Sequence, residues 1–194
     1  MAPPIVLATS NAAKCRQLRW LLEGLPLEPV EADMREMPET AADLAGNAAL
    51  KALACSSEGL AIASDGGLDV PALAGSWDPL LTHRQGQARL LELAARLEDR
   101  RVFWAEAVAV AERGQLLGTW TASGTEGVLA PEPWPPAAAF WVWDIFYFPS
   151  ASKVWSALTP AEREVLDLTW NHLKAEVQAY FRCWHVSPAK GALT

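Results

Sequence analysis

Apolar runs and amphipathic stretches alternate through the first hundred residues of the chain. The apolar run over residues 3–9 ends in small polar residues, as a buried strand does where it reaches a turn. Over residues 12–23, apolar side chains recur at intervals of three and four, which predicts an amphipathic helix. A short strand is expected over residues 25–32 and a loop over 33–39.

The next segments predict a helix, a pair of strands and another helix. The helix covers residues 40–59, with Thr40 as its N-cap and Asp43 three residues later, close to a capping box. Residues 60–73 read as strand, turn and strand, with two consecutive glycines in the turn. A further helix is expected over residues 85–97.

The second half of the chain is richer in β-branched and aromatic residues, which favour strands. The expected elements are strands over 101–111, 116–124 and 125–130, a proline-rich loop over 131–136, one aromatic strand or two strands with a bend over 140–148, a long helix over 159–181 capped by Thr159, and a mobile tail over 187–194. Strands that alternate with helices and then cluster predict an α/β protein with a mixed sheet.

Composition narrows the functional classes. The formal charge is −7 over 194 residues, and no basic stretch offsets it, so we expect no nucleic-acid binding. No secretion signal or membrane-spanning run is evident, which predicts a cytoplasmic protein without a membrane partner. Cys15, Cys55 and Cys183 have no metal-binding spacing and are odd in number, as expected of incidental thiols.

The chain contains ten tryptophans, eight of them at or beyond Trp104. Rings of this size usually fill a core or an interface between subunits. The alternative is that one or two of them stack on a nucleotide base. The sequence alone leaves both interpretations open.

The segment "TSNAAK" lies where the first strand meets the first helix. Backbone N–H groups at a helix N-terminus attract anions, and Thr9, Ser10 and Asn11 can add hydrogen bonds to phosphate oxygens. Lys14 would add a positive charge one turn later. The alternative is that Ser10 or Asn11 only caps the helix.

Two carboxylates are candidates for a metal site. Glu39 precedes a predicted helix, and Asp65 follows a buried strand. Mg²⁺ is held by one or two carboxylates together with water and phosphate oxygens. Asn47 and Lys51 lie one helical turn apart and could reach a common ligand. Taken singly, each of these residues could equally be a cap or a solvated side chain.

A resemblance connects these pieces. In order, "LATSNAAK", "PET…GNAALKA", "ASDGGLDVPALAG", "GTEGVLA" and "WVWDIF" resemble the landmarks of the inosine/xanthosine triphosphate pyrophosphatase family. The match runs from Ile5 to Phe148 and more weakly through the last helix. It implies one α/β domain over residues 1–186, with a long twisted mixed sheet, two lobes and a cleft between them. It also implies a homodimer and Mg²⁺-dependent hydrolysis of a nucleoside triphosphate to monophosphate and pyrophosphate.

The resemblance also implies roles for individual residues. Phosphate contacts are expected from Thr9, Asn11, Lys14 and Lys51, and Lys14 and Lys51 would also be catalytic. Ser10, Asn47 and Gly66 are further substrate-binding candidates. Glu39 and Asp65 would bind Mg²⁺, and Asp65 would also act as the general base. Base contacts are expected from Trp141, Trp143 and Asp144. The substrates of such a family are triphosphates of non-standard purines such as inosine and xanthosine.

The chain departs from the family pattern at several of these positions. Ser64 and Gly66 replace an aspartate and a serine in the acidic turn, and Gly46, Val142 and Ile145 also differ. The Ser-His-Arg signature that reads the purine is absent. A gapped alignment offers Asn171, His172 and Lys174 in its place, whereas an ungapped one offers "DLT".

These losses predict relaxed base selection. The alternatives are a catalytically impaired relative that only binds nucleotide and a tryptophan-rich homodimeric interaction module.

Overall fold

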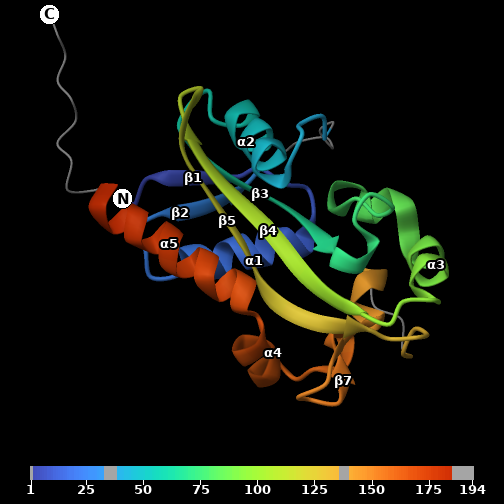
Figure 1. The fold of residues 1–194 in the computed structure, drawn as a ribbon. Helices are drawn as coiled ribbons and strands as arrows, with labels where there is room; N and C mark the ends of the chain where they lie inside the picture. Colours follow the sequence, from blue (N-terminus) through green and yellow to red (C-terminus); the bar gives the residue numbers. More distant parts are fainter. Residues whose placement is uncertain (1, 33–38, 136–139, 185–194) are drawn as a thin grey trace, which may run out of the picture. The chain divides into compact units, whose positions relative to one another are not determined.

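The computed structural model describes residues 2–32, 39–135 and 140–184. Within them, seven strands form one sheet in the order β2-β1-β3-β4-β5-β6-β7 (Figure 1). The strands are β1 (Pro4–Leu7), β2 (Glu28–Glu31), β3 (Leu60–Asp69), β4 (Arg101–Glu112), β5 (Gln115–Leu129), β6 (Phe146–Phe148) and β7 (Lys153–Val154). Strand β1 is parallel to β2 and β3, whereas β6 is antiparallel to β5 and β7. The predicted mixed sheet and α/β class are confirmed.

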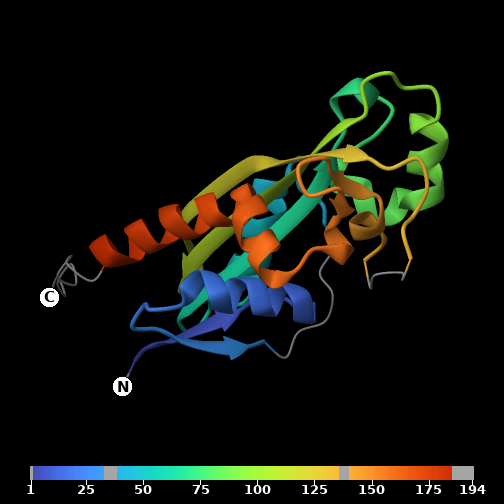
Figure 2. The ribbon, with the colours of Figure 1, turned by 90° about the horizontal axis from the view of Figure 1, so that it is seen from below.

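The α-helices of the described residues are α1 (Ala12–Leu22), α2 (Leu44–Ala54), α3 (Thr82–Ala94), α4 (Pro160–Leu166) and α5 (Leu168–Trp184). Figure 2 shows α1 lying along β1 and β2. The apolar face of α1 is buried as its spacing predicts. None of the helices in the described part of the chain is long and apolar enough to span a membrane.

Strands β4 and β5 are joined by a two-residue turn. Arg113 and Gly114 both have positive φ, at 49° and 75°. A turn with positive φ at both central residues matches the twist of the flanking strands, which is why it joins hairpins. Strand β5 then continues to Leu129 without a break, so the prediction of two separate strands over 116–130 is wrong.

The prediction of a turn at Gly66 and Gly67 is also wrong, because β3 runs through both residues. A Cβ on Gly67 would overlap the backbone carbonyl of Pro79, and a Cβ on Gly66 would overlap the Glu106 side chain. Glycine is needed here for close packing of neighbouring groups rather than for a turn.

Two other expectations need correction. Residues Trp141–Asp144 form a short 3₁₀ helix before β6, so the aromatic segment is not a continuous strand. The long predicted helix is two helices that meet at Asp167, whose backbone is not helical. Thr159 does cap the first of them through a capping box with Glu162. Helix α3 is assigned from Thr82, but Gly86 inside it has non-helical angles (φ 77°, ψ 166°), so its unbroken part begins after Gly86, close to the predicted start at residue 85.

The chain divides into two compact units, and β3, β4 and β5 each continue from one unit into the other. The first unit comprises the described parts of Met1–Asp65, Ala107–Thr121 and His172–Thr194, and the second comprises those of Gly66–Glu106 and Ala122–Asn171. The cleft implied by the resemblance stays a prediction. The proposed domain end at 186 and the tail over 187–194 lie outside the described residues.

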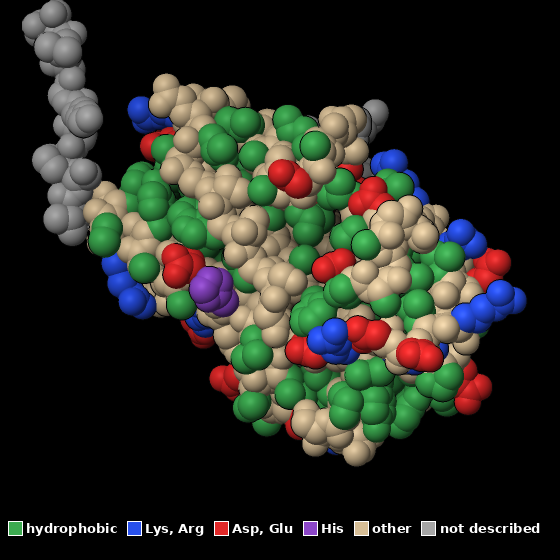
Figure 3. All heavy atoms as spheres, viewed as in Figure 1, with side chains coloured by type: hydrophobic (Ala, Val, Ile, Leu, Met, Phe, Trp, Pro, Cys, Tyr) green, Lys and Arg blue, Asp and Glu red, His purple; other side chains and the backbone are tan. Residues whose placement is uncertain are grey.

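Each unit has its own core. The second unit is filled by large side chains, including a group of tryptophan and phenylalanine rings. In the first unit, alanines of α2 pack against alanines of β3 and β4. Because these side chains are small, the backbone of α2 lies close to the sheet. On the surface, acidic and basic side chains are interspersed among apolar ones on the face drawn in Figure 3.

Candidate active site

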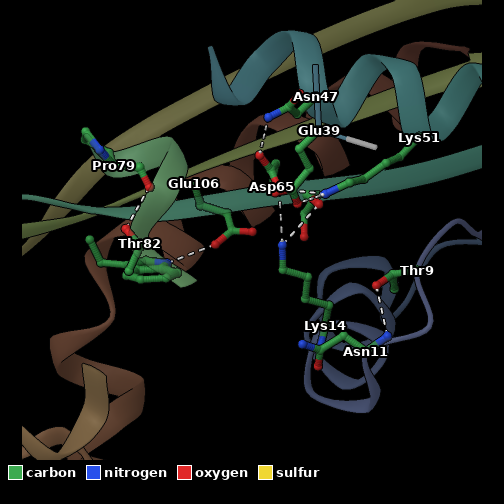
Figure 4. A network of polar contacts seen from close by, with 12 residues as sticks. Thr9, Asn11, Lys14, Glu39, Asn47, Lys51, Asp65, Pro79, Thr82 and Glu106 are labelled. Carbon is green, nitrogen blue, oxygen red and sulfur yellow. Dashed lines mark hydrogen bonds and ion pairs between the residues drawn. The ribbon is translucent and has the colours of Figure 1, made fainter. Parts of the chain in front are cut away.

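The centre of the site is an ion-pair cluster in the first unit. The Lys51 Nζ lies 2.7 Å from Oδ1 of Asp65 and 2.8 Å from Oε1 of Glu39. The Lys14 Nζ lies 3.6 Å from the same Asp65 oxygen and donates a hydrogen bond to the Ser64 carbonyl. Figure 4 shows the two lysines reaching Asp65 from different helices. Four of the predicted residues, far apart in the sequence, are thus brought together.

Asn47 fixes the orientation of the Asp65 carboxylate. Its Nδ2 donates to Oδ2 of Asp65 at 3.1 Å (Figure 4). Its Oδ1 accepts from the amide of Ala41 at 3.0 Å. Asn47 is buried, and both ends of its amide are therefore used. Lys51, one turn later on α2, points to the same place, as the sequence spacing predicted.

The cap of α2 differs from the prediction. Asp43, not Thr40, is the N-cap, and its Oδ1 accepts from the Gly46 amide at 2.6 Å. The helix starts three residues later than expected. This cap and the alanine packing together place Asn47 and Lys51 over Asp65.

The predicted phosphate loop forms the start of α1. Asn11 is the N-cap, and its Oδ1 accepts from the amides of Ala13 and Lys14. The Thr9 hydroxyl accepts from the Asn11 amide at 3.2 Å. Ser10 and Asn11 are exposed. The capping interpretation is confirmed for Asn11, and phosphate binding by this loop stays a prediction.

The charges in the cluster stabilise one another. Burial raises the pKa of Asp65, but the positive charge of Lys14 and the hydrogen bond from Lys51 outweigh it, so its pKa is lowered overall. Burial lowers the pKa of Lys51, but hydrogen bonds to Asp65 and Glu39 outweigh it and raise its pKa. Both groups are therefore charged at neutral pH.

The carboxylates of the cluster are candidate ligands for a hard cation such as Mg²⁺. Among the described residues, no group of three or more histidine, cysteine or acidic side chains could hold a metal by itself. Glu39 and Asp65 nevertheless converge on one positively charged group, the Lys51 ammonium. Two carboxylates at one point fit a cation that takes its remaining ligands from water and phosphate, as Mg²⁺ does.

Comparison with known proteins identifies the family. The model of the Ham1 family matches residues 5–184, which is most of the chain. This chain belongs to the Ham1 family.

Three relatives illustrate the similarity. The chain is 36% identical over 117 residues to a dITP/XTP pyrophosphatase of Prochlorococcus marinus, a match that spans 55% of this chain but only 57% of that relative. It is 32% identical over 170 residues to a dITP/XTP pyrophosphatase of Gloeobacter violaceus, covering 82% of this chain and 85% of the relative. The structure of a HAM1 protein from Coxiella burnetii superposes with a TM-score of 0.76 at 23% identity, over 91% of this chain and 99% of that one.

The predicted base-binding residues of this Ham1 protein lie in the second unit, within a cluster of aromatic rings. The Trp143 ring centroid lies 4.8 Å from that of Trp104 and 5.2 Å from that of Trp155. Trp141 packs edge-on against Trp77, and its carbonyl accepts from Gln87. Trp77, Trp104 and Trp155 are buried in the core, whereas Trp141 and Trp143 are half-buried against it, so stacking of these two on a base stays a prediction. Asp144 is also buried there.

The segment in place of the Ser-His-Arg signature forms hydrogen bonds with the backbone of β4 and β5. The Thr169 hydroxyl accepts from the amides of Gly124 and Thr125 and donates to the Trp104 carbonyl at 2.8 Å. Asp167 accepts from the Trp170 amide and so starts α5. His172 is exposed on α5 and is counted with the first unit.

Sequence reasoning missed Glu106, which is 2% exposed on β4. Its Oε2 accepts from Nε1 of Trp104 at 2.9 Å, and its carboxylate fills the space over Gly66. Gly66 directly follows Asp65 in β3. The available signal was a single acidic residue in the run "VFWAEAVAVA", whose other residues are all apolar.

Proposed function

We propose that this Ham1 protein is a Mg²⁺-dependent nucleoside triphosphate pyrophosphohydrolase. It would convert a triphosphate and water to the monophosphate and pyrophosphate, with non-standard purine nucleotides such as dITP, ITP and XTP as substrates. The names of the Prochlorococcus and Gloeobacter relatives support the substrate class. The observation that carries the proposal is the convergence of Lys14, Lys51, Glu39 and Asp65 on one point.

The chemistry follows from the charges of these side chains. Lys14 and Lys51 would bind phosphate oxygens and stabilise the negative charge that develops as the phosphoanhydride bond breaks. Asp65, held in orientation by Asn47 and ionised, would accept a proton from the attacking water. Asp65 would also orient this water for attack.

Glu39 and Asp65 would hold the metal. When bound, Mg²⁺ supplies polarisation of the phosphoryl oxygens and lowers the pKa of coordinated water. The ligand class agrees with two carboxylates and no histidine or cysteine.

Base selection should be relaxed. The side chains of Asp167 and Thr169 are already engaged in hydrogen bonds within the second unit, and His172 is exposed. A site without buried groups paired to the 6-oxo edge of the base discriminates weakly against a 6-amino base. The resemblance further supports a homodimer, which light scattering in solution would measure.

The test is pyrophosphate release across inosine, xanthosine, guanosine and adenosine triphosphates, with Mg²⁺ and with chelator. We expect release that needs Mg²⁺ and rates for the four bases that lie within about 100-fold of one another. Nucleotide binding without pyrophosphate release would establish the binding-only alternative. A preference for 6-oxo purines well above 100-fold would contradict relaxed selection alone.

A further inference from the structure

The four charged residues of the cluster balance one another. Lys14 and Lys51 contribute two positive charges, and Glu39 and Asp65 contribute two negative charges. The Lys51 side chain is 13% exposed and that of Asp65 is 6% exposed, so water screens this cluster poorly. Because its net charge is zero, the cluster attracts a free divalent cation much less than two unpaired carboxylates would.

Lys51 also occupies the oxygens that a metal would need. Its Nζ lies within 2.8 Å of one oxygen of each carboxylate, and Figure 4 shows it between them. Lys14 is farther from Asp65, at 3.6 Å, and therefore competes less for the same oxygen. A cation that enters alone would have to displace the Lys51 ammonium and then lie beside two like charges.

From these contacts we infer that Lys51 closes the metal position to free cations and that the metal enters together with the triphosphate. The inference rests on the proposed function. The phosphates provide the negative charge that draws Lys51 and Lys14 off the carboxylates, and this frees Glu39 and Asp65 at the moment when a metal–nucleotide complex arrives.

The hydrogen bonds around Asp65 would keep its carboxylate oriented when Lys51 moves to the phosphates. Asn47 holds Oδ2, the oxygen that Lys51 does not contact, and Asn47 is itself fixed by the Ala41 amide. When Lys51 moves, the Asp65 carboxylate keeps one anchor and its orientation. Lys51 is thus a positioning residue for metal entry in addition to a phosphate-binding group.

The experiment measures Mn²⁺ binding to the whole protein by electron paramagnetic resonance, with and without a non-hydrolysable inosine triphosphate analogue. For the wild type, we expect the analogue to tighten Mn²⁺ binding at least ~10-fold, because it supplies negative charge and displaces Lys51. For Lys51→Met without nucleotide, we expect Mn²⁺ binding at least ~10-fold tighter than in the nucleotide-free wild type.

Two variants serve as controls. Lys153→Met removes a lysine that is ion-paired to Glu162 in the second unit, and we expect wild-type Mn²⁺ affinity. Lys51→Arg keeps the positive charge and should retain the weak affinity of the nucleotide-free wild type. If Lys51→Met fails to fold, Lys51→Gln removes the same charge and should show the same tighter Mn²⁺ binding.

Tight Mn²⁺ binding to the nucleotide-free wild type would overturn the inference, as would unchanged affinity in folded Lys51→Met. Pyrophosphate release is assayed on the same wild-type samples. Nucleotide-dependent Mn²⁺ binding without any pyrophosphate release would overturn the proposed hydrolysis and leave the role of Lys51 standing.

Discussion

The carboxylate of Glu106 occupies the space that a side chain at Gly66 would need. Glu106 is buried and is bonded to the indole of Trp104, which packs against Phe140 and Trp143. It is therefore held where it lies. The glycine at position 66 and the glutamate at position 106 form a matched pair.

Gly66→Ser should consequently destabilise the protein. The serine Cβ would meet the Glu106 carboxylate, and we expect the free energy of unfolding to fall by about 1–3 kcal/mol, as overpacking usually costs. Adding Glu106→Ala to Gly66→Ser should recover part of the loss. Gly59→Ser is the control, because its Cβ would meet nothing within 4 Å. Chemical denaturation measures all four proteins, and Gly66→Ser at wild-type stability would contradict the pairing.

Asp65→Asn should reduce turnover at least ~10²-fold, because it removes the group proposed to orient the water and one of the two proposed metal ligands. The change keeps the size of the side chain. Asp69→Asn, four residues along the same strand, is the matched control and should retain activity. The measurement is steady-state pyrophosphate release; near wild-type turnover in Asp65→Asn would exclude this residue from the mechanism.

The cap of α2 can be tested independently of catalysis. Asp43→Ala removes the acceptor for the Gly46 amide and should lower the free energy of unfolding by about 1 kcal/mol. Thr40→Ala, at the position that the sequence favoured, should change it by less than ~0.5 kcal/mol. Equal losses from both substitutions in thermal or urea denaturation would mean that Thr40 shares the capping role.

Asp167 should give stability a measurable pH dependence. Burial raises the pKa of Asp167 to about 6, against hydrogen bonds from Trp170 and Thr125 that lower it. The folded state thus binds a proton more tightly than the unfolded state, whose aspartate has its ordinary pKa near 4. This contribution is present below pH 4 and is lost as the pH rises from about 4 to 6.

The magnitude is about 1–2 kcal/mol for such a partly exposed carboxyl. Asp167→Asn, which can still cap α5, should remove this slope and leave the protein at least as stable as the wild type at pH 7. Urea denaturation from pH 4 to 7 measures it. The free energy of unfolding of Asp167→Asn is subtracted from that of the wild type at each pH. A difference that rises from pH 4 to 6 would contradict the raised pKa.

The α/β class, the first strands and helices, and four charged residues of the site were all predictable from the sequence. The elements follow from local periodicity, which a chain expresses before it folds. The roles of Lys14, Glu39, Lys51 and Asp65 came from ordered motifs that resemble one family. Neither source could give the cap at Asp43 or the break at Asp167, because both depend on which neighbouring amide groups the helix leaves unpaired.

Contacts between segments distant in the chain were decided only by the tertiary structure. Gly66 and Gly67 read as a turn because glycine favours turns, yet they lie inside a strand where Glu106 and Pro79 leave no room for a Cβ. Likewise, Lys51 reads as a surface lysine of an alanine-rich helix until α2 packs on the sheet and places its ammonium between two carboxylates. Periodicity in the sequence predicts which face of a helix or strand a residue lies on. Close backbone packing and ion pairs between distant segments form only when those helices and strands pack together.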